Sequence, residues 1–116
     1  MTQMDEKTQA EFTKELLSLC DEMRIQSKIY MEKKNLSGRA YDPRYLRKSI
    51  SLNGGYSAAR KLISSPSFSK GLQELASQDL LSLSLEAFIL RPEWAQYFTD
   101  DEIASAKEHL AYFSVK

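Results

Sequence analysis

The sequence predicts an all-α protein, with a long N-terminal helix followed by a compact bundle of four to six short helices. Residues 5–35 contain neither Pro nor Gly and are rich in Glu, Lys, Leu and Met, which favours helix. Farther along, apolar residues recur three or four positions apart in short segments that Pro, Gly, Asn and Ser separate. A chain of 116 residues can bury one core. We therefore expect residues 1–36 to form the long helix and residues 37–116 a compact helical domain.

The long helix carries two apolar faces. One is a narrow stripe whose members lie three, four or seven positions apart: Phe12, Leu16, Leu19, Met23 and Tyr30. Ile25 and Ile29 lie on a different face, roughly 100° or more away at 100° per residue. A helix of about 30 residues would run ~45 Å, which is longer than a domain of this size needs. We therefore expect Ile25 and Ile29 to contact a partner or a second copy of the chain, before residues 35–38 end the helix.

The second and third helices are expected on either side of a glycine pair. Asp42 is a good N-cap, and Pro43 suits the first helical position because its missing N–H costs nothing there. The pair Gly54-Gly55 interrupts the helix that follows, and a third helix is expected from about residue 56 to 63. The apolar residues expected to face inward from these two helices are Leu46, Ile50, Ala59, Leu62 and Ile63.

Residues 68–90 are less regular. A fourth helix is expected over residues 68–76, with Phe68, Leu72 and Leu75 buried. In residues 80–90, alternating Leu and Ser fit a short strand, and a helix beginning at Ser82 or Ser84 fits equally well. Because a lone strand has nothing to pair with in a helical chain, helix is favoured.

The last helix has a clear beginning. Pro92 stops the preceding segment and starts one more turn. Thr99 and Glu102 then form a capping box, in which each side chain accepts a hydrogen bond from the backbone N–H of the other residue. The inner face of this helix is expected to consist of Ile103, Ala106, Leu110 and Phe113.

Cysteine and histidine usage excludes several kinds of site. The single cysteine, Cys20, cannot form an internal disulfide, and its place on the apolar stripe predicts a buried, inert thiol. The single histidine, His109, has no further Cys or His with which to build a zinc site, so a structural or solvent-facing role is expected. Helix capping already explains the acidic run 100–102. The sequence therefore predicts no enzyme activity, no metal and no cofactor.

The cellular location is predicted from what the sequence lacks. No run of 18 apolar residues is present, so no membrane span is expected. The first residues lack the basic and apolar regions of a signal peptide. Together with the single cysteine, these observations favour a cytoplasmic protein.

Charge is sorted along the chain although the net charge is zero. Residues 24–70 hold 11 Lys and Arg against 2 Asp and Glu, a balance of +9, and the flanking blocks carry −4 and −5. A neutral chain with such a block can still present a strong local field. The candidate binding residues are Lys33, Lys34, Arg39, Arg44, Arg47, Lys48, Arg60 and Lys61.

The basic block has three interpretations. Lys and Arg neutralise phosphates, and the neighbouring tyrosines 41, 45 and 56 can bond phosphates or stack on bases. Two short helices joined by a glycine-containing turn also resemble a helix-turn-helix. The same charges suit the acidic surface of a protein. Alternatively, the acidic ends of the chain fold back and neutralise the block.

Several segments keep the order of a known pattern. They are GGYSAARKLI (54–63), SKGLQEL (69–75), LSLEAFIL (83–90), YFTDDE (97–102) and residues 106–110, preceded by YDPRYL (41–46). In these segments, over roughly residues 41–112, the chain resembles a helical module of uncharacterised bacterial proteins, some of them linked to restriction or nuclease genes. The module's usual Trp is absent, and Leu75-Ala76 stand in its region. The resemblance implies a helical fold and assigns no activity or site residue.

The functional prediction is a non-enzymatic helical binding module that contacts nucleic acid or a nucleoprotein through its basic surface. The alternative is a protein-binding inhibitor or adaptor of the anti-CRISPR kind, encoded by a mobile element and acting on a host defence nuclease. Such proteins are small, have a single domain and lack a catalytic site, as this chain does. A homodimer formed through the N-terminal helix is a separate expectation.

Overall fold

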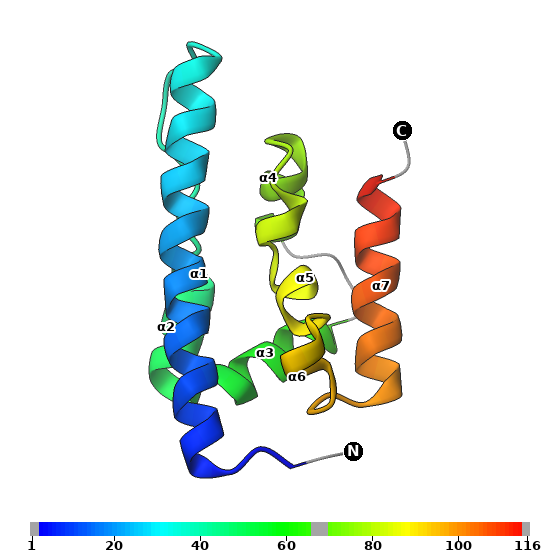
Figure 1. Ribbon diagram of the computed structural model, residues 1–116. Coiled ribbons are helices and arrows are strands. Elements are labelled where there is room, and N and C mark those ends of the chain that lie inside the picture. The colour runs from blue at the N-terminus through cyan, green and yellow to red at the C-terminus, as the bar shows by residue number, and fades with distance from the viewer. Residues whose placement is uncertain (1–2, 66–69, 115–116) are drawn as a thin grey trace.

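The computed structural model describes residues 3–65 and 70–114, which form seven α-helices and one 3-10 turn and contain no strand. Three columns of helix make up the molecule (Figure 1). The outer columns are α1 (Glu6–Lys33) and α7 (Asp100–Ser114), and the middle column holds α4 (Lys70–Ser77), α5 (Leu85–Ile89) and α6 (Pro92–Ala95). Helix α2 (Arg44–Asn53) packs on α1, and α3 (Gly55–Ile63) crosses from α1 toward α7. The predicted all-α class, with a long first helix and shorter ones after it, is confirmed.

Helix α1 has 28 residues and a length of ~42 Å, close to the 45 Å long axis of the molecule. The Asp5 side chain caps its start by accepting a hydrogen bond of 2.7 Å from the backbone N–H of Thr8. It ends in the predicted turn, where Asn35 adopts a left-handed φ of 52°. The predicted stripe is buried from Phe12 to Met23, while Ile25 and Ile29 are 46% and 38% exposed on the other face.

The core is centred on Phe12 of α1. The Phe12 ring centroid lies 5.0 Å from that of Trp94 and 5.3 Å from that of Phe88, and Phe98 and Tyr56 complete the cluster. These rings come from α1, α3, α5, α6 and the segment before α7. The long helix therefore shares one hydrophobic core with the described helices that follow it.

The crossing of α1 and α3 depends on a close backbone approach. A Cβ atom at Gly55 would lie 2.9 Å from the Cα of Thr13, so only glycine fits at this point. The Gly55 N–H also donates to the Thr13 hydroxyl over 3.0 Å. Gly54, at a φ of 81°, is the single residue between α2 and α3. The predicted glycine turn therefore also brings α3 onto α1.

One local prediction is wrong, and another falls partly outside the described residues. Asp42 does not cap α2, which begins at Arg44 with Pro43 at the N-cap position and without a side-chain cap bond. The Asp42 carboxylate instead accepts a hydrogen bond of 3.0 Å from Arg47 Nε. The described part of the fourth helix is Lys70–Ser77, and the predicted helical positions 68 and 69, with the expected burial of Phe68, lie outside the described residues.

Residues 80–90 are helical, as favoured over a strand. They form a 3-10 turn, η1 (Leu81–Leu83), and then α5. Ser84 caps α5 through a 3.1 Å bond from the Ala87 N–H to its hydroxyl. The break between the two elements explains why the Leu–Ser alternation resembled a strand.

The predicted capping box begins α7. The Thr99 N–H donates to Glu102 Oε1 over 2.8 Å, and the Glu102 N–H donates to the Thr99 hydroxyl over 3.1 Å. The inner face of α7 is more polar than predicted, because Glu102 and His109 are buried beside Ala106. None of the helices in residues 3–65 and 70–114 combines the length and apolar character needed to cross a membrane.

Candidate functional site

A groove of about 580 Å³ lies between α1 and the segment that leads from its end to α2. We call it the basic groove, and it is lined by Arg24, Ile25, Lys28, Ile29, Glu32, Arg39, Ala40, Asp42 and Arg44. The returning segment is held on α1 by a 2.8 Å hydrogen bond from the Tyr41 N–H to the buried hydroxyl of Ser27. This bond places Arg39 and Arg44 opposite the side chains of α1.

The basic groove has an excess of positive charge. Its described lining contains four Lys and Arg residues and two carboxylates, Glu32 and Asp42. Arg47, which lies outside the lining, already neutralises Asp42. Within residues 3–65 and 70–114, no carboxylate lies within ion-pair distance of Arg24, Lys28 or Arg39.

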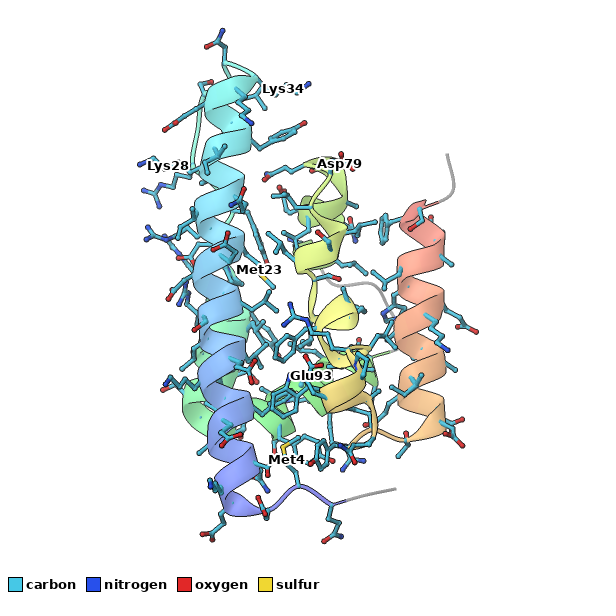
Figure 2. All side chains as sticks on the ribbon, in the orientation of Figure 1. Met4, Met23, Lys28, Lys34, Asp79 and Glu93 are labelled. Atoms are coloured by element: carbon cyan, nitrogen blue, oxygen red, sulfur yellow. The ribbon has the colours of Figure 1, made fainter. Side chains whose placement is uncertain are left out.

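Two of the predicted basic residues and both predicted isoleucines line the basic groove. The basic pair is Arg39 and Arg44, and the Arg44 side chain is 75% exposed although its Nε lies 3.9 Å from Asp42. Arg24 and Lys28 also line the groove and were missing from the predicted set. Their spacing of four on a helix, each one position before an isoleucine, is a sequence signal that could have identified them. Figure 2 shows Lys28 projecting from α1 away from the middle column, toward which Met23 points.

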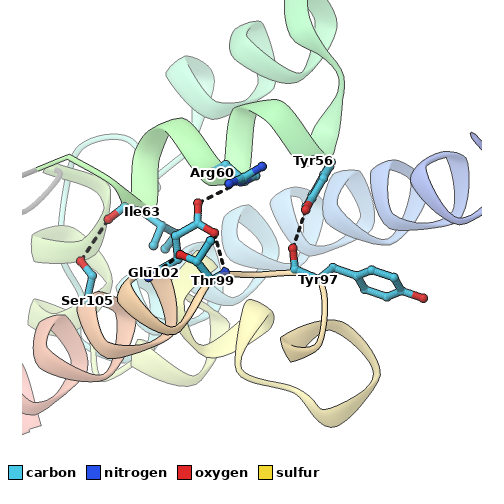
Figure 3. Close-up of polar contacts among 7 residues, drawn as sticks. All are labelled: Tyr56, Arg60, Ile63, Tyr97, Thr99, Glu102 and Ser105. Carbon is cyan, nitrogen blue, oxygen red and sulfur yellow. Dashed lines mark hydrogen bonds and ion pairs between the residues drawn. The ribbon is translucent and has the colours of Figure 1, made fainter. Parts of the chain in front are cut away.

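Acidic residues from the ends of the chain neutralise two other predicted binding residues. Arg47 Nη2 lies 2.8 Å from Asp21, and Arg60 Nε lies 2.9 Å from Glu102 (Figure 3). The hydrogen bond to Glu102 raises the pKa of Arg60 above its ordinary value. Folding back of the acidic ends therefore accounts for Arg47 and Arg60, as one of the three interpretations predicted.

The other predicted basic residues are exposed and lie outside the groove lining: Lys33, Lys34, Lys48 and Lys61. In the described part of the chain, none of these four lysines has an ion pair. Helix α3 is largely engaged in packing, since Ser57 and Lys61 are its exposed members among nine described residues. Figure 3 shows its Tyr56 hydroxyl donating to the backbone carbonyl of Tyr97. A helix-turn-helix needs an exposed second helix to enter the DNA groove, and α3 has few exposed residues for this.

A second hollow, of about 430 Å³, lies between the start of α2 and helices α4, α5 and α7. We call it the inner pocket. Its apolar lining is Met23, Leu46, Leu62, Leu72, Leu75 and Leu85. The same pocket is lined by Tyr41, Glu86 and His109, and it shares Asp42 and Arg44 with the basic groove. The pocket could not be predicted from the sequence, because its walls come from six helices and a loop.

Glu86 and His109 form a buried pair in the lining of the inner pocket. His109 Nδ1 lies 2.9 Å from Glu86 Oε2, and each side chain is 8% exposed. The pair joins α5 to α7. Of the two roles expected for His109, structural or solvent-facing, the buried contact fits the structural one. Glu86 was missed because it lies in an apolar run and its partner is 23 residues away.

Burial raises the pKa of two further ionisable groups. Cys20 is fully buried, as predicted, and this burial raises the pKa of its thiol to about 11. Burial, with smaller contributions from Cys20, Asp42, Glu74 and Glu86, raises the pKa of Tyr41 to about 12. Both groups are therefore protonated at neutral pH. The nucleophilic form of cysteine is the thiolate, so the protonated Cys20 thiol is unreactive. The described residues contain no group of three His, Cys, Asp or Glu that could hold a metal ion.

The resemblance to a bacterial helical module stays a prediction. It was drawn from the order of sequence segments, and the geometry of the site does not test it. The site consists of a basic groove, a neighbouring apolar pocket and a buried Glu–His pair in the lining of that pocket. Comparison of the chain with protein-family models, curated proteins and solved structures finds no match in any of the three.

Proposed function

We propose that this protein is a non-enzymatic module that binds nucleic acid through the basic groove. The supporting observation is that Arg24, Lys28, Arg39 and Arg44 gather in one open groove. Arginine and lysine in such an arrangement neutralise phosphates and release counterions, which is the main source of affinity in sequence-independent binding. The cytoplasm is the proposed location.

The proposed ligand is a single strand or a strand end. A duplex is usually read by a helix that enters its major groove, and α3 offers few exposed residues for that purpose. A strand needs a positively charged channel, which the basic groove supplies, and aromatic faces, which Tyr41 and Tyr45 supply from the lining of the adjacent inner pocket. Contacts of this kind position a ligand and carry little sequence information by themselves.

The binding of a fluorescent ten-nucleotide strand should weaken steeply with salt. If all four basic residues of the groove contact phosphates, log Kd should rise with log salt concentration with a slope of about 3, since each contact contributes about 0.7. The double variant Arg24→Gln/Arg39→Gln should bind at least about tenfold more weakly at low salt and lower that slope by about 1.4. Fluorescence anisotropy over a salt series measures both quantities.

The matched control is Lys7→Gln/Lys107→Gln, which removes the same two charges from exposed positions outside the groove. Its affinity and salt slope should stay close to those of the unaltered protein. Equal weakening by both double variants would mean that net charge, and not the groove, controls binding. Absence of binding by the unaltered protein to strand and duplex at low salt would overturn the proposal.

A second candidate function is that of a protein-binding inhibitor or adaptor encoded by a mobile element and acting on a host defence nuclease. The observation that favours it is the exposure of Ile25 and Ile29, two large apolar side chains, in the same groove. Phosphate groups gain nothing from contact with apolar side chains, whereas a protein partner or a second copy of the chain would bury them.

The variant Ile25→Asp/Ile29→Asp separates the two candidates. If the groove binds protein, this variant should lose a stoichiometric partner that the unaltered protein captures, and sedimentation should show whether that partner is a second copy. If the groove binds nucleic acid, the same variant should weaken strand binding by like-charge repulsion without releasing any protein. Retention of the protein partner would argue against a protein-binding role for this face.

A further inference from the structure

The basic groove and the inner pocket are adjacent, and Asp42 and Arg44 line both. Their chemistry differs, because the groove is positively charged while the pocket is mainly apolar and its charged lining is mixed, with Asp42 and Glu86 beside Arg44 and Lys70. Asp42 adds little repulsion at the shared wall, since Arg47 binds its carboxylate. A ligand that occupies both must therefore carry an anionic group next to a flat or apolar group with hydrogen-bond donors.

The inner pocket is large enough for a small aromatic group. Its volume of about 430 Å³ lies within the ~300–1,000 Å³ of typical small-molecule sites. Tyr45 lines it and is 66% exposed, so its ring is accessible to a ligand. Protein aromatic rings bind unstacked nucleic-acid bases in this way.

The polar lining of the pocket offers a hydrogen-bond acceptor. Glu86 uses Oε2 for the contact with His109, and no described group bonds to its other oxygen, Oε1. A carboxylate oxygen accepts from an amino group and repels a carbonyl oxygen, which is how Glu and Asp recognise the N4 amino group of cytosine. The pocket thus favours a base with an exocyclic amino group.

We propose that the inner pocket holds one unstacked, amino-bearing nucleobase whose phosphate lies in the basic groove beside Arg44. This inference rests on the proposed function and names the unit of the ligand that the site recognises. Tyr45 stacks on the base, Glu86 accepts from its amino group, and Arg44 binds its phosphate. A free nucleotide and a nucleotide within a strand share this chemistry.

The first test compares Tyr45→Ala with Tyr112→Ala, a change at another exposed tyrosine that lies outside both hollows. Because stacking on one aromatic ring is a large part of the binding of a base, Tyr45→Ala should weaken binding of a ten-nucleotide deoxycytidine strand by about tenfold. Tyr112→Ala should leave it unchanged. Both side chains are exposed, so both variants should fold, which thermal unfolding checks.

The second test uses ten-nucleotide strands of deoxycytidine and deoxyuridine, whose bases differ in the amino group. The unaltered protein should bind the deoxycytidine strand more tightly by about tenfold. Glu86→Gln should abolish or reverse that preference, because an amide can donate to the O4 atom of uracil and can still accept from His109 Nδ1. The control Glu108→Gln removes an exposed carboxylate from α7 and should keep the preference.

The outcomes separate this inference from the proposed function. If Arg24→Gln/Arg39→Gln weakens binding while Tyr45→Ala and Glu86→Gln change nothing, the groove binds nucleic acid and the base pocket is wrong. The pocket would then be a candidate site for an apolar side chain of a protein partner. If dCMP alone binds with the same preference over dUMP, the ligand is a free nucleotide. If dCMP alone does not bind, the ligand is a strand. If no strand or nucleotide binds at all, both proposals fail.

Discussion

Replacing Phe12 with alanine should lower the free energy of unfolding by about 3–5 kcal/mol. The Phe12 side chain is fully buried and contacts four aromatic residues from separate parts of the chain, as its ring distances of 5.0–6.2 Å show. The loss would combine the transfer of a large apolar side chain into water with the cavity left behind. Because small domains are stable by about 5–15 kcal/mol, the variant should be close to unfolding at room temperature.

Urea denaturation followed by circular dichroism measures this loss. The control is Leu52→Ala, which truncates a side chain that is 72% exposed on α2 and should change stability by no more than about 0.5 kcal/mol. Phe12→Leu should fall between the two, because it keeps an apolar group in the same space. A loss for Phe12→Ala as small as that for Leu52→Ala would mean that the ring cluster is not the centre of the core.

Replacing Gly55 with alanine should destabilise the protein by about 3 kcal/mol, at the upper end of the cost of overpacking. The new Cβ would lie 2.7 Å from Thr13 Oγ1 and 2.9 Å from Thr13 Cα. Helices α1 and α3 would have to separate, and the 3.0 Å bond from the Gly55 N–H to Thr13 would lengthen. In a helix without this contact, alanine would be stabilising by up to about 1 kcal/mol relative to glycine.

The sign of the change therefore tests the helix crossing. Ser57→Ala, at an exposed position on the same helix, is the control and should be nearly neutral. Adding Thr13→Ala to Gly55→Ala should restore little stability, because the Thr13 backbone atom stays within 2.9 Å of the new Cβ. Stabilisation by Gly55→Ala would contradict the close approach of the two helices.

Much of the secondary structure was predictable because its causes are local. A capping box at Thr99 and Glu102 needs residues three positions apart, and both of its hydrogen bonds are formed. The stripe from Phe12 to Met23 needs helical periodicity alone. The predicted cap at Asp42 was wrong for a tertiary reason, because Arg47 takes the carboxylate and itself bonds Asp21 on α1.

The candidate site was predictable in part. The basic block pointed to Arg39 and Arg44, and the second apolar face pointed to Ile25 and Ile29, all of which line the basic groove. Arg47 and Arg60 have the same composition signal but are paired with Asp21 and Glu102. Charge counts along a chain cannot separate these two groups, because they do not show which carboxylate each cation meets.

The fold class, the long first helix, the burial of Cys20 and the start of the last helix all followed from patterns among residues close together in the sequence. The basic groove, the inner pocket and the Glu86–His109 pair depend on contacts between segments that lie far apart along the chain, 23 residues in the case of that pair. The physical reason is that periodicity and capping are properties of neighbouring residues, whereas a pocket and an ion pair exist only once helices have packed. A close approach such as that of Gly55 to Thr13 determines how they pack.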